Sequence, residues 1–178
     1  APAVTEAVRD LLNNRDGLML GICNGFQALI KLGLVPYGDI VPMTAECPTL
    51  TFNTIGRHQS RLVRTRVASN LSPWLAKTEV GDMHTIAISH GEGRFVASDD
   101  VLAQLKANGQ IATQYVDEAG VPGMDLDVNP NGSLLAIEGI TSPDGRVFGK
   151  MGHSERYSNG TFKNVPGEKD QPLFAAGV

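Results

Sequence analysis

A cysteine, Cys23, lies in the segment GICNGFQ, residues 21–27. A short apolar run precedes this segment, and residues 26–32 have the apolar spacing of a helix. A strand, a sharp turn that carries a nucleophile and a helix together form a nucleophile elbow. Gly21 and Gly25 lack Cβ atoms where the backbone bends and where the strand and the helix approach each other. The pattern predicts that Cys23 lies at a helix N-terminus, where the partial positive charge favours the thiolate that attacks a carbonyl carbon.

A structural role is the alternative for Cys23, because a free cysteine after an apolar run is usually a small buried hydrophobe. The flanking glycines and the helix pattern favour the reactive role. Cys47, the second cysteine, lies in a proline-containing connection without an activating turn, and we interpret it as an incidental thiol. Two cysteines do not make a disulfide framework, and a reactive thiol fits a reducing compartment, so we expect a cytoplasmic protein.

His153 and Glu155 stand two residues apart, directly after a strand predicted over residues 146–151. Alternate side chains of an extended segment point the same way, so the two groups can meet. The histidine could take the proton of Cys23, and the carboxylate could orient the imidazole. His-x-Glu pairs are common by chance, and the pair gains weight only together with the cysteine turn. The combination is a Cys/His/Glu hypothesis for nucleophilic catalysis.

A strand predicted over residues 84–90 leads into the glycine-rich turn of residues 91–93. Such turns at strand ends are where α/β folds place ligands. We predict no metal site, because no third ligand at metal spacing accompanies the two histidines of this strand. His84 is interpreted as a structural histidine with satisfied hydrogen bonds. The binding candidates here are Ser89, His90, Glu92 and Arg94.

The periodicity of the chain predicts a single α/β domain over residues 1–178, because helix, strand, elbow and helix alternate near its start. The predicted helices span residues 4–12, 26–32 and 99–108, and the predicted strands span residues 18–22, 61–68, 84–90, 110–116, 133–141 and 146–151. Residues 142–145, SPDG, predict the turn of a hairpin. Residues 34–56 and 117–132 are long connections, and the acidic residues of the second do not match a calcium loop.

The composition excludes several classes of function. The 178 residues carry a net charge of −4, so no basic surface indicates nucleic-acid binding. No apolar run approaches the roughly 20 residues of a membrane helix, and the first residues lack the pattern of a signal peptide. Because the chain opens in a helical pattern, we expect a fragment or a chain whose first strands are not included.

The segment GICNGFQ and the later GHSER together resemble the class I, or triad, glutamine amidotransferases. The similarity is closer to the glutaminase domains of phosphoribosylformylglycinamidine synthases, and it covers nearly the whole chain. The segments that carry it are ICNGFQALIKLGLVPYG, ISHGEGRFVAS, NPNGS, AIEGITSPDGRVFGKMGHSER and DQPLFAAGV. The resemblance implies a flavodoxin-like, three-layer α/β/α fold. It also implies that the family's first strands, and a glycine-rich loop that gives a second oxyanion donor, belong upstream of residue 1.

The resemblance implies a role for each candidate residue. Cys23 would attack the carboxamide carbon of L-glutamine, form a γ-glutamyl thioester and release ammonia. His153 would be the general base and then the general acid, and Glu155 would orient it. The backbone N–H of Asn24 would donate to the oxyanion. The positions implied for binding glutamine are Gln27, His90, Gly91 and Glu92.

The resemblance also implies a partner. In the family, ammonia passes to a synthetase that uses ATP and Mg²⁺ to convert formylglycinamide ribonucleotide to formylglycinamidine ribonucleotide in purine biosynthesis. The chain has no Gly-x-x-x-x-Gly-Lys loop, so we expect no cofactor in this domain. The connections 34–56 and 117–132 are the candidate contacts with the synthetase.

Two other functions remain open, a non-catalytic regulatory or interaction domain of this fold and a cysteine peptidase on a related fold. Ser154 stands where many members of the family have a proline between the histidine and the glutamate. Since a proline would stiffen this step, we expect the serine to loosen the His153–Glu155 pair.

Overall fold

The hairpin predicted around residues 142–145 lies inside a six-stranded sheet of the computed structural model, which describes residues 1–178. Its arms are β7 (Ile137–Thr141) and β8 (Val147–Lys150), which pair antiparallel. The strand order is β1-β8-β7-β6-β3-β4. β1 (Met19–Ile22) pairs parallel with β8, whereas every other neighbouring pair is antiparallel. The strand predicted over residues 18–22 is therefore present as β1 and lies parallel to its neighbour β8. The sheet as a whole is mixed.

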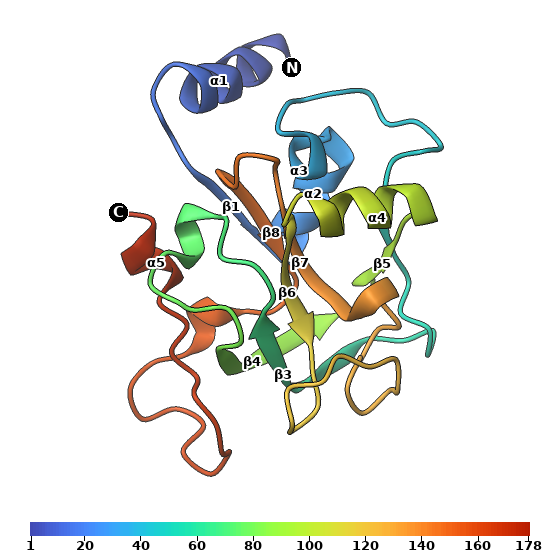
Figure 1. Ribbon diagram of the computed structural model, residues 1–178, viewed down its shortest axis with the longest axis vertical. Coiled ribbons are helices and arrows are strands. Elements are labelled where there is room, and N and C mark those ends of the chain that lie inside the picture. The colour runs from blue at the N-terminus through green and yellow to red at the C-terminus, as the bar shows by residue number, and fades with distance from the viewer.

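The remaining elements surround this sheet. The other strands are β3 (Gln59–Val67), β4 (Met83–His90) and β6 (Ile111–Tyr115), with β2 (Thr49–Thr51) and β5 (Arg94–Val96) forming a separate pair. The α-helices are α1 (Pro2–Asn13), α2 (Asn24–Leu32), α3 (Leu34–Tyr37), α4 (Asp99–Ala107) and α5 (Leu173–Ala176). Short 3₁₀ turns occupy Pro73–Leu75, Leu134–Ala136 and Ser154–Arg156. Figure 1 shows α2, α3 and α4 on one side of the sheet and α5 on the other, with α1 standing apart near the N-terminus.

Apolar side chains of the sheet enter three clusters, and two of these show which face of the sheet each residue covers. On β8, Val147 belongs to the larger cluster with α2 and α4, while its neighbour Phe148 packs with the C-terminal α5. On β6, Ile111 and Ala112 divide in the same way. Because successive strand residues point to opposite faces, the two clusters lie on opposite sides of the sheet. The helix–sheet–helix layering confirms the predicted α/β class.

Helix ends follow the local chemistry of the chain. α2 ends at Gly33, which adopts φ = 84°, a left-handed conformation that costs glycine little. α4 begins after Ser98, whose side chain accepts a hydrogen bond from the backbone of Val101. The predicted helices over residues 26–32 and 99–108 are confirmed, with small differences at their ends.

The strand predicted over residues 133–141 is wrong in its first part. Leu135 and Ala136 both have positive φ, 52° and 54°, and the segment Leu134–Ala136 is a 3₁₀ turn instead. Ser133 is held there by the side chains of Asn129 and Asn131, which accept from its backbone N–H. The connection 34–56 likewise contains structure that the pattern did not predict, namely α3 and β2.

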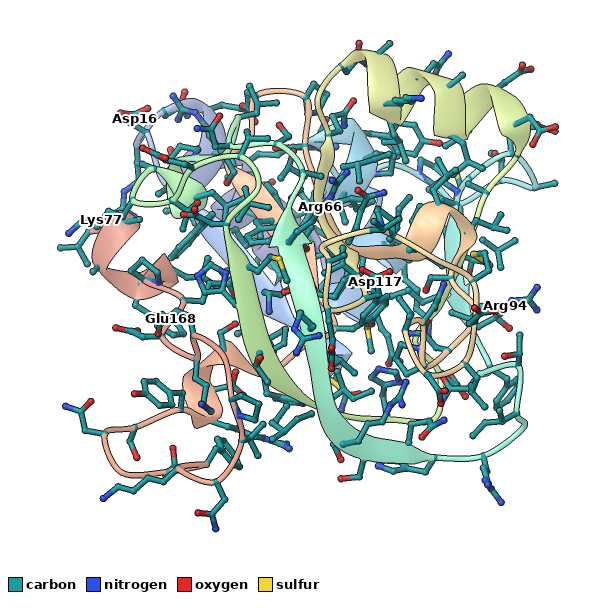
Figure 2. All side chains as sticks on the ribbon, turned by 60° about the horizontal axis from the view of Figure 1, so that its bottom comes forward. Asp16, Arg66, Lys77, Arg94, Asp117 and Glu168 are labelled. Atoms are coloured by element: carbon teal, nitrogen blue, oxygen red, sulfur yellow. The ribbon has the colours of Figure 1, made fainter.

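The outer edge of β4 is covered by later parts of the chain. Thr85 donates its backbone N–H to the carbonyl of Glu168 at 2.6 Å, and His153 donates its own to Ala87 at 2.7 Å. Figure 2 shows Glu168 in the C-terminal segment beside this edge. The turn that carries His153 and the C-terminal segment therefore lie next to each other on one strand. No helix has both the length and the apolar character needed to cross a membrane.

Candidate functional site

Cys23 occupies the sharp turn between β1 and α2. It has φ = 55° and ψ = −107°, a strained conformation for a residue with a Cβ atom. Its backbone N–H donates to the carbonyl of Lys150 at 2.8 Å, which ties the turn to the end of β8. The predicted strand, turn and helix are therefore present, with the cysteine at the N-terminus of α2.

The two glycines of the turn differ in how closely neighbouring atoms approach them. A Cβ atom on Gly21 would lie 2.5 Å from Cδ1 of Leu29 and 2.7 Å from the carbonyl of Gly25, so strand and helix approach there as predicted. A Cβ atom on Gly25 would meet nothing within 4 Å. The close-approach argument holds for Gly21 and is wrong for Gly25.

The thiol of Cys23 is buried, with 8% of the residue exposed, and its Sγ lies 3.6 Å from the carbonyl oxygen of Ser89. Burial raises the pKa of Cys23, while a hydrogen bond from the N–H of Asn24 and the positive charge of Arg156 act in the opposite direction. The fold therefore does not favour the thiolate as expected, because desolvation by burial outweighs the hydrogen bond from Asn24 and the charge of Arg156. The cysteine is a thiol that needs a base.

His153 has the arrangement that such a base requires. Its Nδ1 lies 2.5 Å from Oε1 of Glu155, and a carboxylate can only accept, so the shared proton sits on Nδ1. Its Nε2 is buried and has no partner, which leaves this nitrogen free to accept a proton. Residues 154–156 form a 3₁₀ turn rather than the predicted extended segment, yet the two side chains meet.

One cavity of about 720 Å³ brings most of the predicted site residues together. Only three of its 14 lining residues are hydrophobic, which suits a polar ligand. Glu155 is not part of the lining and contacts the cavity only through the imidazole of His153. The predicted residues that line it are Cys23, Asn24, Gln27, Ser89, His90, Gly91, Glu92 and His153.

Gln27 and Glu92, both predicted to bind substrate, contact each other across this cavity. Nε2 of Gln27 donates to the carbonyl of Glu92 at 2.6 Å, which joins α2 to the glycine-rich turn. His90 is 4% exposed, neither of its ring nitrogens has a partner, and burial lowers its pKa to about 4. The imidazole of His90 is thus neutral at ordinary pH and has unused hydrogen-bonding capacity beside the cavity.

Two predictions about the same strand and turn were wrong. His84 is buried, but its Nδ1 has no hydrogen-bond partner, so it is not the satisfied structural histidine that we expected. Arg94 lies on β5 outside the cavity lining, and Figure 2 shows it toward one side of the molecule. Alternation along the strand could not reveal that the chain turns away from the cavity after residue 92.

A buried polar network fixes the glycine-rich turn. Asn53 donates through Nδ2 to the carbonyl of His90 at 2.9 Å and accepts from the N–H of Gly93 at 3.2 Å. Asn131 and Ser133 donate to the carbonyl of Gly93 at 2.7 and 3.2 Å. The segment NPNGS, which the sequence offered only as part of a resemblance, therefore has a structural role, since it supports the wall of the cavity.

Six further residues line the cavity without having been predicted as site residues. His58 contacts the hydroxyl of Ser89 through Nε2 at 3.0 Å. Its neighbours in the sequence gave no local signal, because residues 34–56 and the segment after them lack periodicity. Arg156 ends the segment GHSER and could have been noticed there. The six residues are Ile22, Phe52, Gly56, Arg57, His58 and Arg156.

Comparisons with known proteins agree with this geometry. The family model described as the CobB/CobQ-like glutamine amidotransferase domain matches residues 1–178. Phosphoribosylformylglycinamidine synthase subunit PurQ of Aquifex aeolicus is 39% identical over 140 residues, covering 79% of this chain and 56% of the relative. The subunit PurQ of Salinibacter ruber is 38% identical over 156 residues, covering 88% of this chain and 60% of the relative.

The fold is also similar to a solved structure. The structure of PurLQS from Thermotoga maritima matches with a TM-score of 0.65 and 29% identity, covering 97% of this chain and 69% of that chain. The chain spans somewhat more than half the length of the two curated relatives. The resemblance seen in the sequence motifs is thereby confirmed, and the chain belongs to the family of CobB/CobQ-like glutamine amidotransferase domains.

Proposed function

We propose that this domain hydrolyses glutamine as the glutaminase component of a phosphoribosylformylglycinamidine synthase. The observation that carries the proposal is a single polar cavity lined by Cys23 and His153, with Nδ1 of the imidazole bonded to Glu155 and Nε2 free. The names of the curated relatives support the choice of enzyme. The cysteine lies in a strained turn at a helix N-terminus, which exposes a nucleophile to a substrate in the cavity.

The first half of the reaction forms a thioester. Nε2 of His153 removes the proton of the Cys23 thiol as the sulfur attacks the carboxamide carbon of glutamine. The backbone N–H of Asn24 donates to the oxyanion that develops. The C–N bond then breaks, the nitrogen takes the proton from the imidazolium of His153, and ammonia leaves.

The second half returns the enzyme to its starting state. His153 takes a proton from water, the oxygen attacks the thioester carbon, and the C–S bond breaks to give glutamate. The sulfur takes the proton back from His153. Glu155 accepts from Nδ1 throughout and stabilises the imidazolium, so the raised pKa of Cys23 is overcome by a base rather than by prior ionisation.

The glutamine itself would lie against the wall formed by α2 and the glycine-rich turn. Gly91 and Glu92 supply backbone groups there, and Gln27 holds the turn in place through the carbonyl of Glu92. His90 would border the ligand as part of the cavity lining, with its imidazole buried and neutral. These four positions are the proposed substrate-binding set.

The ammonia would be consumed by a synthetase partner, which would also hold ATP and Mg²⁺, while this domain needs no cofactor of its own. The naming of the curated relatives as a subunit of a synthase supports a partner. The cavity is lined by neutral polar groups, histidines and arginines, with Glu92 as its one carboxylate, which is a poor set of ligands for Mg²⁺.

Replacing the nucleophile tests the proposal. In the intact native polypeptide, assayed with its synthetase partner, Cys23→Ala should reduce glutamine-dependent synthesis to background, because no thioester can form. Synthesis from added ammonia should persist, because the partner's chemistry does not use Cys23. Product formation from glutamine and from an ammonium salt is measured side by side.

Cys47→Ala is the matched control, since it also removes a thiol and should leave both activities unchanged. Persistence of glutamine-dependent synthesis in Cys23→Ala would contradict the proposal. Absence of glutamate release from the wild-type protein, even with the partner present, would favour a non-catalytic interaction domain.

A further inference from the structure

A lysine and a glutamate are buried together at the end of the sheet, beneath the turn that carries His153. The side chains of Lys150 and Glu138 are both 0% exposed, and Nζ lies 3.1 Å from Oε1. Neither residue stands out in the sequence. Burying two charges is expensive, and an ion pair is retained in such a place only where further hydrogen bonds satisfy both groups.

Those further hydrogen bonds converge on the residues on either side of His153. Glu138 accepts from the N–H of Gly152 at 2.8 Å, and Lys150 donates to the carbonyl of Gly152 at 2.9 Å. Lys150 also donates to the hydroxyl of Ser154 at 2.9 Å. The buried pair therefore holds the backbone just before His153 and the side chain just after it.

The hydroxyl of Ser154 connects the buried pair to the C-terminal segment. It donates to Oε1 of Gln171 at 2.6 Å, and both residues are buried. The C-terminal segment is itself fixed on β4, where Glu168 accepts from the backbone of Thr85. A chain of contacts thus runs from Glu138 through Lys150 and Ser154 to Gln171.

His153 depends on this support, because its side chain has only one hydrogen bond. That bond goes to Glu155, whose side chain is 40% exposed, while Nε2 has no partner. The rest of the imidazole's placement must come from the backbone of the turn. Catalysis by a free Nε2 needs that placement to be accurate within a fraction of an ångström.

We propose that Lys150, Ser154 and Gln171 are positioning residues that hold His153 against Cys23, so that the C-terminal segment is part of the catalytic machinery. This inference rests on the glutaminase function proposed above. It also reverses the expectation that a serine at position 154 loosens the His153–Glu155 pair, because the hydroxyl gains two hydrogen bonds.

Ser154→Ala tests the inference against Ser142→Ala. Ser142 is also a buried serine, with its hydroxyl bonded to Asp144 and to the N–H of Val147, but it lies in the hairpin turn at the other end of β8. Both variants lose two hydrogen bonds of one hydroxyl. In the intact native polypeptide with its partner, Ser154→Ala should lower kcat for glutamine hydrolysis by about tenfold to a hundredfold without raising KM. Ser142→Ala should leave kcat unchanged.

A second variant covers the case in which Ser154→Ala does not fold. Gln171→Met removes the acceptor with little change of shape and should lower kcat in the same direction. Where both single variants fold, the double variant Ser154→Ala/Gln171→Met is also measured. Its fold-loss in kcat should be smaller than the product of the two single fold-losses, because both changes break the same chain of contacts.

A readout independent of glutamine turnover separates this inference from the proposed function. In the wild-type protein, the Nδ1 proton between His153 and Glu155 should give a downfield nuclear magnetic resonance signal that persists against exchange with water. The signal should broaden in Ser154→Ala and in Gln171→Met, and it should remain in Ser142→Ala.

The outcomes are distinct. If the wild-type protein does not hydrolyse glutamine, the proposed function fails, and the imidazole signal still tests the positioning role. If Ser154→Ala and Gln171→Met keep wild-type kcat and an unchanged signal, the inference is overturned. An equal loss in Ser142→Ala would also overturn it, since the effect would then be one of general stability.

Discussion

At the scale of single residues, the two cysteines have opposite environments. Burial raises the pKa of Cys23, whereas hydrogen bonds from the backbone and side chain of Thr44 lower the pKa of Cys47. Cys47 is also the more exposed of the two thiols. A reagent that selects thiols only by their ionisation would therefore favour Cys47, and selectivity for Cys23 requires binding in the cavity together with a base.

The local sequence identified Cys23 and His90 as candidate site residues, but it did not predict the direction in which the fold shifts their pKa values. The segment GICNG indicates a nucleophile elbow, because a cysteine flanked by two glycines is enough to predict a sharp turn that carries a thiol. The pKa of Cys23 depends on desolvation and on Arg156, more than 100 residues later, so no local pattern could give its direction. The same holds for His90, whose depressed pKa follows from burial among distant segments.

His90 should make stability depend on pH. Its pKa falls from 6.5 in the unfolded chain to about 4 in the fold, so between these values the unfolded state binds more protons. Stability should decrease by up to about 3 kcal/mol as the pH falls from 6.5 to 4. Urea unfolding of the wild-type protein and of His90→Gln across this range measures the effect.

His90→Gln should lose most of this slope while keeping the fold. His84 is buried too, and its pKa is also lowered, so a smaller slope of the same sign should remain. An identical slope in His90→Gln and wild type would contradict the assignment of a neutral, buried His90.

At the scale of elements, the closeness of β1 and α2 depends on one glycine. Gly21→Ala should destabilise the fold by about 1–3 kcal/mol, because the new methyl group would overlap Leu29 and the carbonyl of Gly25. Gly25→Ala should be neutral or stabilising by up to about 1 kcal/mol, because its Cβ atom meets open space within a helix. The urea concentrations at the unfolding midpoints of Gly21→Ala, Gly25→Ala and the wild-type protein measure these differences in stability.

Gly25→Ala is the matched control, since it makes the same chemical change in the same turn. Equal destabilisation by both variants would mean that the backbone conformation, rather than the close contact at Gly21, is what the turn requires.

Elements with strong local signals were the most predictable part of the fold. The turn SPDG gave the hairpin of β7 and β8, and apolar periodicity with Gly33 gave α2. The turn at Leu134–Ala136 was not predictable, because it depends on distant partners: Gln114 donates to the carbonyl of Leu135, and Ser133 contacts Gly93. The apolar residues there look like a strand until those contacts are known.

At the scale of the whole molecule, the site depends on contacts between segments far apart in the chain. Cys23 is tied to Lys150, His153 to Ala87, and Gln27 to Glu92. The sequence could nominate the cysteine, the histidine and the glutamate, since each of these residue types has its own part in the chemistry. It could not give the supporting Lys150–Glu138 pair or the Asn131 network, because burial and partners of polar residues are decided by tertiary packing.

The arrangement of the sheet explains why the site forms at this place. Ile22 of β1 lies beside Lys150 of β8 in a parallel pair, so the residues that follow both strands emerge at the same end. Cys23 follows one strand, and the His153 turn follows the other. This pairing brings Cys23, near one end of the chain, and the turn of His153, near the other, to the same end of the sheet.

The central claim is that Cys23 acts within a glutamine-binding cavity with the help of His153. The most direct measurement is labelling of the intact protein with a chloroketone analogue of glutamine, followed by mass spectrometry of the peptides that contain Cys23 and Cys47. We predict alkylation of Cys23 alone, protection by glutamine, and much slower labelling in His153→Gln. Labelling that favours the more readily ionised Cys47, or that glutamine does not slow, would contradict the claim.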